Sequence, residues 1–437
     1  MLLPTLPMLL LLLPPTLAKL TPIFSTRSSS FDPLQHLGGQ SPYFPAPAQY
    51  GVSSALPAGC HIDQVSYLVR HGARYPTKGS YAGWVSLQQK IANATFVARG
   101  PLRFLPGWKV PVNDAGNETE MLSGEGALEA FRLGFELRQL ELTPGGEGLT
   151  VWSASQQRVV DTAQWFLDGY LSQGHYNISD LGKIVLMADS VNYTYANSLT
   201  PTNSCPKFAE NDTLGSNYRA AYKPAIVTRL NRYLDGLTLD VTDVGKMMDL
   251  CGYQTEISGY SPFCDVFTES EWLGFEYAQD LQYYYGSGPG NKMAGTSFWP
   301  YLKAVTELFL VGPNTTTPGS SFVPPPVLMA FTHDNDLSPL IAALGIFNET
   351  ALNPTRITPK RTFRSSNTIS SGGRIALERL ACAATVSEPS FVKHIAQTDH
   401  KSSMYSSFVR IKARIFIDRL EALKRRADTR SAFFVGQ

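Results

Sequence analysis

The chain has 437 residues, of which 43% are hydrophobic and 17% are charged, so it is globular and long enough to bury a large core. Its 37 Lys and Arg residues almost balance its 36 Asp and Glu residues, which gives a formal charge of +1. This balance excludes bulk attraction to nucleic acid or to an anionic membrane. We therefore expect no nucleic-acid or membrane partner, and any anion site must be local.

The first residues have the composition of a secretory leader. An apolar core from Met8 to Leu13 and a small-residue exit at Leu17-Ala18 predict a signal peptide over residues 1–18. The apolar run is far shorter than the roughly 20 residues that span a bilayer. Residues 19–58 are rich in Ser, Pro and Gly without a sustained period, which predicts an extended arm on the surface.

Sequons and cysteines agree with this leader. Seven Asn-x-Ser/Thr sequons predict a glycosylated, secreted, extracellular protein: Asn93, Asn117, Asn177, Asn192, Asn211, Asn314 and Asn348. A secreted context permits disulfides, and Cys251 and Cys264 enclose a short polar loop, which predicts a local bridge. No Cys/His cluster has the spacing of metal ligands, so we expect no zinc site.

The first predicted strand ends in a cluster of cations. Residues 65–69 favour an extended chain, which stops at the heptapeptide Arg70-His71-Gly72-Ala73-Arg74-Tyr75-Pro76. Ligands of open α/β sheets bind outside the carboxyl ends of the strands, so His71 is expected at the mouth of a pocket. The planar guanidinium groups of Arg70 and Arg74 suit phosphate oxygens.

The middle of the chain carries helical periodicity. It predicts helices over residues 84–97, 126–141, 214–234, 269–285 and 298–310. The leucine-rich face of residues 126–141 and the run Tyr283-Tyr284-Tyr285 are expected to be core packing. A second strand at residues 148–152 is followed by Arg158 at the start of a helix, where free N–H groups and the helix dipole favour an anion.

A third predicted strand, residues 327–331, is an almost continuous apolar run, as is typical of a buried strand. It ends at Thr332-His333-Asp334-Asn335-Asp336. Ser338 as N-cap and Pro339 as the first helical residue then predict a helix. This unit therefore delivers a histidine and a carboxylate at the end of a strand.

These motifs resemble a known family. The heptapeptide from Arg70 to Pro76 resembles the signature of the histidine acid phosphatases, in their fungal acid phosphatase and phytase branch, and His333-Asp334 matches the second signature. The resemblance implies an α/β fold, with a mixed sheet flanked by helices as in phosphoglycerate mutase, and a smaller, mostly helical domain. The expected parts are a catalytic α/β domain of residues 59–78, 148–195 and 325–385, helical insertions of residues 79–147 and 196–324, and a divergent, basic, helix-prone tail of residues 386–437.

The resemblance also implies the chemistry of the site. His71 would attack phosphorus and form a phosphohistidine. Asp334 would protonate the leaving oxygen and then activate water, which predicts an acidic pH optimum because the ordinary pKa of Asp is about 3.9. The phosphoryl group would be bound by Arg70, Arg74, Arg158 and His333. Because arginines supply the charge, we expect no metal and no cofactor.

Two further expectations come from the same resemblance. It pairs Cys60 with Cys382, and Cys251 with Cys264, which leaves Cys205 without a partner. It also bears on the substrate, because Gln282-Tyr283 stands where phytate-selective fungal phytases carry a lysine pair. This difference argues against a strong preference for phytate, although Lys78 and Lys292 would add positive charge.

The sequence therefore predicts a secreted acid phosphatase or phytase that hydrolyses small-molecule phosphomonoesters, including inositol phosphates. Two alternatives stay open: a broad-specificity acid phosphatase with little preference for phytate, and a catalytically silent, secreted phosphate-binding protein. A phosphoglycerate-mutase-like enzyme is disfavoured by the leader, the predicted disulfides and the His333-Asp334 pair.

Overall fold

The structure is a computed structural model that describes residues 31–44, 60–139, 148–172, 181–189, 197–316, 319, 321–347, 351–382 and 408–412. The chain divides into two compact units, Met1–Asp32 and Pro33–Gln437. Of the first unit only Phe31 and Asp32 are described, so the predicted signal peptide lies outside the described residues. All helices and strands named below belong to the second unit.

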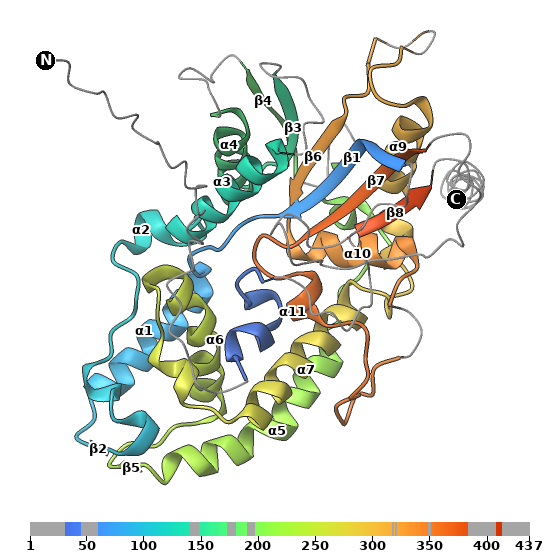
Figure 1. The fold of residues 1–437 in the computed structure, drawn as a ribbon. Coiled ribbons are helices and arrows are strands. Elements are labelled where there is room, and N and C mark those ends of the chain that lie inside the picture. The colour runs from blue at the N-terminus through green and yellow to red at the C-terminus, as the bar shows by residue number, and fades with distance from the viewer. Residues whose placement is uncertain are drawn as a thin grey trace, which may run out of the picture. The chain divides into compact units, whose positions relative to one another are not determined.

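A six-stranded mixed sheet occupies the upper part of Figure 1, in the order β4-β3-β6-β1-β7-β8. Its strands are β1 (Cys60–Arg70), β3 (Leu149–Ala154), β4 (Gly182–Met187), β6 (Val327–Thr332), β7 (Arg374–Cys382) and β8 (Phe408–Lys412). Strands β4, β3, β6 and β1 are parallel, and β7 runs antiparallel to β1. The predicted mixed sheet is thus confirmed, whereas the helix-prone tail is wrong for Phe408–Lys412, which pairs with β7 as a strand.

The register of the sheet aligns the two signature motifs. Arg70 at the end of β1 is the register partner of Thr332 at the end of β6. His71 and His333 therefore follow neighbouring parallel strands at one edge of the sheet. Strand β6 is buried along its whole length, as its continuous apolar sequence predicts. Helix α4 (Gln157–Leu171) begins at the same edge, three residues after β3 ends.

Four helices share the hydrophobic core of the sheet: α3 (Gly124–Arg138), α4, α9 (Trp299–Val311) and α10 (Asp334–Leu344). The predicted boundaries placed α3 and α9 in the helical insertions, but Leu133 of α3 and Leu302 of α9 lie in the core beside the strands. For these two helices the predicted boundary is wrong. Periodicity shows that a helix has an apolar face but not which layer that face contacts.

Helices α3 and α4 cross through glycines. A Cβ atom on Gly134 would stand 2.0 Å from the carbonyl oxygen of Phe166, and one on Gly169 would stand equally close to the carbonyl oxygen of Phe131. This close approach explains a partial error in the predicted core stripe of α3. Its buried members include Leu133 and Leu137, whereas Leu128 and Phe135 are exposed.

The other long helices form a layer in the lower half of Figure 1: α1 (Lys78–Ala92), α5 (Thr213–Asn231), α6 (Val241–Ser258) and α7 (Glu269–Gly286). Short helices are α2 (Ala115–Glu118), α8 (Ala294–Ser297) and α11 (Ser365–Thr368), and a small antiparallel pair joins β2 (Val97–Ala98) to β5 (Leu234–Asp235). The 3-10 turns are η1 (Pro33–His36), η2 (Gly38–Gln40), η4 (Gly100–Leu102), η5 (Leu105–Gly107), η7 (Pro201–Ser204) and η8 (Pro262–Asp265).

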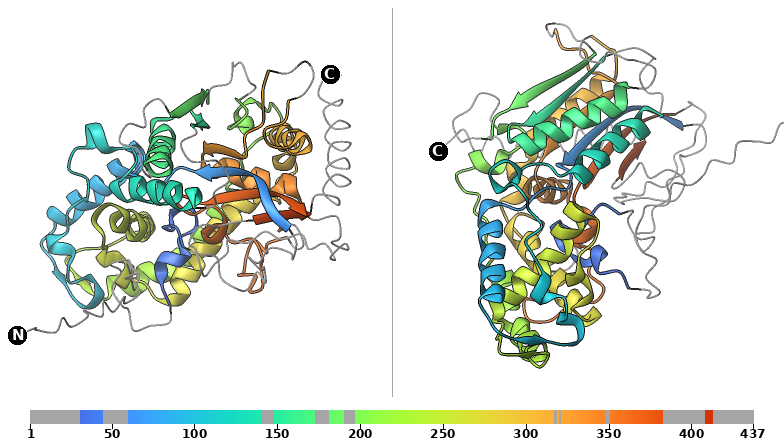
Figure 2. Two further views of the ribbon diagram at one scale, coloured as in Figure 1. Left: turned by 45° about the horizontal axis from the view of Figure 1, so that its top comes forward. Right: turned by 90° about the vertical axis from the view of Figure 1, so that its left-hand side faces the viewer.

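The arm predicted for residues 19–58 is neither extended nor on the surface where the structure describes η1 and η2. These turns contact α7 and α11, and in both views of Figure 2 they lie, in blue, against the helical layer. Leu37 between them is fully buried. A Cβ atom on Gly38, whose φ is +61°, would stand 2.5 Å from the Cβ atom of Gln279. The prediction is wrong here because glycine-rich sequence also permits tight packing of backbone against a helix.

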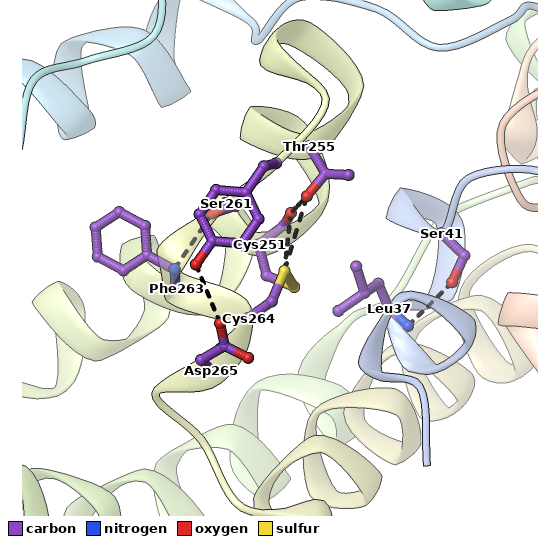
Figure 3. Close-up of a disulfide and its surroundings, with 9 residues drawn as sticks. Leu37, Ser41, Cys251, Thr255, Ser261, Phe263, Cys264 and Asp265 are labelled. Carbon is purple, nitrogen blue, oxygen red and sulfur yellow. Dashed lines mark hydrogen bonds between the residues drawn. A yellow bond between two sulfur atoms is a disulfide. The ribbon is translucent and has the colours of Figure 1, made fainter. Parts of the chain in front are cut away.

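The predicted bridge between Cys251 and Cys264 is present (Figure 3). Its expected polar loop is largely helical, because Cys251 lies inside α6 and Cys264 in η8. Cys205 is a free cysteine, as expected. Cys60 and Cys382 are register partners in the β1–β7 ladder, but their side chains lie outside the described part, so this bridge stays a prediction.

Two predictions concern the surface. Of the sequon asparagines, Asn93, Asn117, Asn211 and Asn314 are exposed. The other three, Asn177, Asn192 and Asn348, lie outside the described residues, and glycosylation itself stays a prediction. None of the described helices combines the length and the apolarity needed to cross a membrane.

Candidate active site

His71 follows the last residue of β1 and is only 1% exposed. Its backbone amide donates to the carbonyl oxygen of Thr332 at 3.0 Å, and its Nδ1 lies 2.9 Å from the carbonyl oxygen of Gly72. Because a carbonyl oxygen only accepts, this contact assigns the proton to Nδ1 and the lone pair to Nε2. His71 therefore has a basic nitrogen suited to attack on phosphorus.

Gly72 allows this turn to pass between helices. A Cβ atom on Gly72 would stand 2.6 Å from the carbonyl oxygen of Gly126 in α3. The amide of Gly72 donates to the hydroxyl of Thr162 at 3.1 Å, and that hydroxyl donates to the carbonyl oxygen of Arg158 at 2.7 Å. The turn after β1 is thus fixed to the first turns of α4, which carries Arg158.

Three arginines act on His71. Arg70, 4% exposed, donates through its guanidinium to the carbonyl oxygens of Gly39 and, at 2.7 Å, Ile369. Arg74 donates to the carbonyl oxygen of Tyr75 at 2.9 Å. The Nε atoms of Arg70, Arg74 and Arg158 are buried and have no hydrogen-bond partner among the described residues. Buried donors without acceptors are costly unless a ligand supplies the acceptors, which an oxyanion can do.

Asp334 is the first residue of α10. Its carboxylate accepts a hydrogen bond from the Tyr283 hydroxyl at 2.7 Å and lies 3.4 Å from the Arg70 guanidinium. The predicted helix start, with Ser338 as N-cap and Pro339 as first residue, is wrong by five residues, since α10 begins at Asp334 and Pro339 lies inside it. Asp334 and Asp336 lie in the first turn, where carboxylates favour the positive end of the helix dipole and outweigh the one bond that proline removes.

His333 is held by a carboxylate that sequence analysis missed. Its Nε2 lies 3.2 Å from Oδ2 of Asp189, which follows β4. Oδ1 of Asp189 accepts the amide of Ser155 at 2.8 Å, so the carboxylate joins the ends of β3 and β4. Because a carboxylate only accepts, this contact assigns a proton to Nε2. The rings of His333 and His71 lie edge to face, with centroids 5.7 Å apart.

Electrostatics keeps the imidazole of His71 neutral. Burial lowers its pKa well below 6.5, and the charges of Arg70 and Arg158 lower it further. The ring therefore keeps its lone pair at acidic pH, as a nucleophile must. Burial and the neighbouring charge of Arg74 also lower the pKa of Arg158 to about 10, a sign that cations outnumber anions in the ligand-free site.

The protonation of Asp334 differs from the expectation. Burial alone would raise its pKa, but the charge of Arg70 and the hydrogen bond from Tyr283 outweigh burial and hold the pKa well below its ordinary range. The carboxyl group is therefore ionised in the ligand-free site, even at mildly acidic pH. An acidic optimum does not follow from an ordinary carboxyl pKa at this position.

A cavity of about 340 Å³ opens at this edge of the sheet. One wall carries Arg70, Arg74 and Asp334, and the other is built by α5, α6 and α7, including Tyr283. His71 does not line the cavity itself but interacts with Arg70 and Asp334, which do. The six predicted site residues thus lie near one another at this edge of the sheet, and three of them, Arg70, Arg74 and Asp334, line the cavity. Within the described residues, no three His, Cys, Asp or Glu side chains converge as metal ligands.

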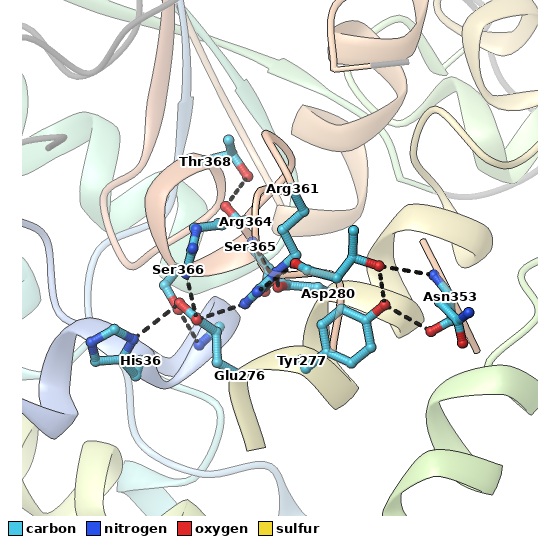
Figure 4. Close-up of polar contacts among 12 residues, drawn as sticks. His36, Glu276, Tyr277, Asp280, Asn353, Arg361, Arg364, Ser365, Ser366 and Thr368 are labelled. Carbon is cyan, nitrogen blue, oxygen red and sulfur yellow. Dashed lines mark hydrogen bonds and ion pairs between the residues drawn. The ribbon is translucent and has the colours of Figure 1, made fainter. Parts of the chain in front are cut away.

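A second arginine network, the supporting network, joins η1 and α11 to α7 (Figure 4). Arg361 contacts Glu276 at 2.8 Å and Asp280 at 2.5 Å, both on α7, and Arg364 contacts Glu276 at 3.1 Å. His36 of η1 lies 3.3 Å from the same Glu276. The network thus ties η1 and α11 to α7, and these elements are next in the chain to Gly39 and Ile369, whose carbonyl oxygens accept from Arg70.

The sequence motifs do not mark three further residues of the site: Tyr283, Asp189 and Thr162. Tyr283 was predicted as core packing, and nothing in its sequence context marks it as a site residue. Asp189 does have a signal, because it comes two residues after the apolar strand β4, at the carboxyl edge. Thr162 follows Arg158 by one helical turn and therefore lies on the same face of α4.

Comparison with known proteins supports the fold and the family. The family model of the Histidine phosphatase superfamily (branch 2) matches residues 61–397. Acid phosphatase PHO1 of Komagataella pastoris is 31% identical over 371 residues, 83% of this chain and 77% of that protein. Phytase PHO112 of Candida albicans is 31% identical over 360 residues, 80% and 76% of the two chains. The phytase from D. castellii superposes with a TM-score of 0.71 at 24% identity, over 81% of this chain and 77% of that one.

The matched segment contains both strand ends that form the site, from β1 with His71 to β6 and α10 with Asp334. It also covers well over half of the chain, so the similarity is not confined to a short motif. The resemblance of the two signature motifs is confirmed by this match. The chain belongs to branch 2 of the histidine phosphatase superfamily.

Proposed function

We propose that this protein is a phosphoric monoester hydrolase of the acid phosphatase and phytase type, which acts on small phosphate esters through a phosphohistidine. The observation that carries the proposal is the buried, neutral imidazole of His71 beside three arginines with unused donors. Relatives named acid phosphatase and phytase support the same activity. The leader and the exposed sequons support a secreted glycoprotein.

In the proposed reaction the arginines bind the phosphoryl oxygens and hold phosphorus in front of Nε2 of His71. The N–P bond forms while the P–O bond to the leaving group breaks, which gives a phosphohistidine and an alcohol. Water then attacks the phosphohistidine, releases inorganic phosphate and restores the imidazole. His333, oriented by Asp189, contributes to the binding of the phosphoryl group.

The leaving oxygen needs a proton, yet Asp334 is ionised in the ligand-free site. Below about pH 6 a phosphate monoester is mainly a monoanion, so the substrate brings this proton. An anionic phosphate raises the pKa of a neighbouring carboxylate, and Asp334 therefore takes up the proton as the substrate binds. It then passes the proton to the leaving oxygen and, as a carboxylate, activates water. The acidic optimum follows from the substrate.

The test is the variant His71→Ala, assayed with p-nitrophenyl phosphate at pH 5. We expect kcat to fall by at least about 10⁴-fold, because a removed nucleophile leaves only transition-state binding. The variant His61→Ala, at the exposed start of β1, is the matched control. An acid-labile phosphoenzyme should be trapped in the wild type and not in His71→Ala. Turnover near the wild-type rate in His71→Ala would refute the mechanism, and phosphate binding without turnover by the wild type would favour the silent alternative.

A further inference from the structure

The wall of the cavity opposite the arginines carries a lysine without a partner. Lys223 on α5 lines the same cavity as Arg70 and Asp334. Among the described residues, no hydrogen bond or ion pair engages its ammonium group. Burial lowers its pKa, and the charge of Asp249 opposes this shift without direct contact. A partly buried ammonium group without a counter-ion in the protein would be stabilised by an anion that binds in the cavity.

The backbone of α6 makes room for this ammonium group. A Cβ atom on Gly245 would stand 2.7 Å from Nζ of Lys223, so the absence of a side chain there creates the space that Nζ fills. Glycine inside a helix costs about 1 kcal/mol relative to alanine. Gly245 therefore lowers the stability of the helix slightly, but it allows the ammonium group of Lys223 to occupy this position in the cavity wall.

Two neighbouring groups leave the charge of Lys223 available. Arg219, one turn earlier on α5, forms an ion pair with Asp212 and donates to Gln282 at 3.1 Å. Its positive charge repels that of Lys223 and does not neutralise it. Asp249 accepts a hydrogen bond from the amide of Gln40 at 3.3 Å. Burial raises the pKa of Asp249 to about 6, so the carboxylate that acts on Lys223 loses its charge as the pH becomes acidic.

We propose that Lys223 binds a second phosphate group of the substrate while the first is held at His71, which makes it a specificity-determining residue for organic phosphates that carry two or more phosphate groups. This inference rests on the proposed function, because the first phosphate must be bound by the site arginines. It replaces the expectation for Lys78 and Lys292, which are exposed and do not line the cavity. The basic charge comes from α5 instead of the positions of Gln282 and Tyr283.

The test compares two substrates that differ by one phosphate, fructose 1,6-bisphosphate and fructose 6-phosphate, at pH 5. The readout is the ratio of their kcat/KM values. In Lys223→Gln we expect the ratio to fall by about tenfold or more, because a hydrogen bond to a charged group is lost. The control Lys303→Gln removes a lysine of α9 that pairs with Glu307 outside the cavity and should leave the ratio unchanged.

A second variant keeps the lysine and moves it. Gly245→Ala favours the helix and should fold, but it displaces Nζ, so we expect the ratio to fall severalfold. In the double variant the alanine should add nothing to Lys223→Gln, since both act through one ammonium group. An unchanged ratio in Lys223→Gln, or additive losses, overturns the inference. Hydrolysis of fructose 6-phosphate reports the proposed function separately: its absence in the wild type would refute that function instead.

Discussion

Two arginine clusters, joined by residues 33–41, use the same side chain in opposite ways. Among the described residues, one carboxylate, Asp334, lies at ion-pair distance from the active-site arginines Arg70, Arg74 and Arg158. In the supporting network two arginines contact two carboxylates, Glu276 and Asp280, and Asp280 also accepts from the amide and the hydroxyl of Ser365. Excess positive charge creates a binding site, whereas balanced charge fixes the surrounding backbone.

The direction of the pKa shift distinguishes Arg158 of the active site from Arg361 of the supporting network. For Arg158, burial and the charge of Arg74 lower the pKa to about 10. For Arg361, burial also lowers the pKa, but the charges of Asp280 and Glu276 outweigh it, and the pKa is raised. At neutral pH the charge of Arg158 therefore lowers the free energy of unfolding, and the charge of Arg361 raises it.

Within the two arginine clusters, the largest effect is expected for Arg158. In Arg158→Ala we expect kcat/KM for p-nitrophenyl phosphate to fall by roughly 10³-fold, the scale on which an arginine stabilises a transferring phosphoryl group. The melting temperature in phosphate-free buffer should stay the same or rise, because a repelled cation is removed. Steady-state kinetics and calorimetry measure both. A clear loss of thermal stability together with activity would show that Arg158 is paired, and Arg132→Ala on exposed α3 surface is the control.

The converse is expected for Arg361. Replacing it by Met leaves Glu276 and Asp280 without their main counter-ion, which should cost about 3–5 kcal/mol of unfolding free energy. Urea unfolding at pH 7 measures the loss. If charge balance is the cause, the additional changes Glu276→Gln and Asp280→Asn should recover part of it. Further destabilisation by these changes would mean that packing and not charge is responsible.

The two clusters also show what sequence alone can predict. The strand ends with His71 and His333 are marked by local signals, namely apolar runs that stop at charged residues. Their alignment is set by the register of Arg70 with Thr332, which depends on parallel pairing between residues far apart in the chain. The same holds for Asp189, whose partner His333 is 144 residues away. No local pattern specifies such a contact.

Helix α6 was missed for a different reason. Its sequence includes Gly245, Gly252 and several residues of low helix propensity, so tertiary packing outweighs local preference. One local signal was present, since Asp240 and Asp243 form a capping box at its start. The glycine that obscured the helix is the residue that accommodates Lys223, so a departure from local rules marks a functional position.

Two buried carboxyl groups, those of Glu256 and Glu129, predict that the stability of the fold depends on pH. Burial, and then the nearby charge of Glu129, raises the pKa of Glu256 to about 8, while burial raises that of Glu129 to about 7. A carboxyl group whose folded pKa is raised contributes stability that is fully present below its unfolded pKa of about 4.5 and is lost as the pH rises through the folded value.

We therefore expect the melting temperature to fall by a few degrees between pH 5 and pH 8.5. Glu256→Gln, which cannot ionise, should flatten this dependence, and calorimetry across pH measures it. Glu269→Gln changes an exposed carboxylate on α7 and is the matched control. An equally steep decline in Glu256→Gln would assign the pH effect to other groups.

The smallest effect is expected at Tyr283, where one hydrogen bond joins the helical layer to the site. Tyr283→Phe keeps the ring and removes the bond that lowers the pKa of Asp334. The pKa of Asp334 should rise by roughly one unit, since a bond to a charged group contributes about 1.5 kcal/mol or more and 1.36 kcal/mol corresponds to one unit. Because Asp334 then holds its proton to a higher pH, the alkaline limb of the kcat profile should move toward neutral pH, while the maximal kcat changes by less than about tenfold.

Tyr285→Phe is the matched control. It removes a hydroxyl of the same helix that donates to the carbonyl oxygen of Leu352 at 2.6 Å outside the cavity, and it should leave the profile in place. Equal shifts in both variants, or a lower kcat in Tyr283→Phe at an unmoved limb, would show that Tyr283 acts on the site through packing alone.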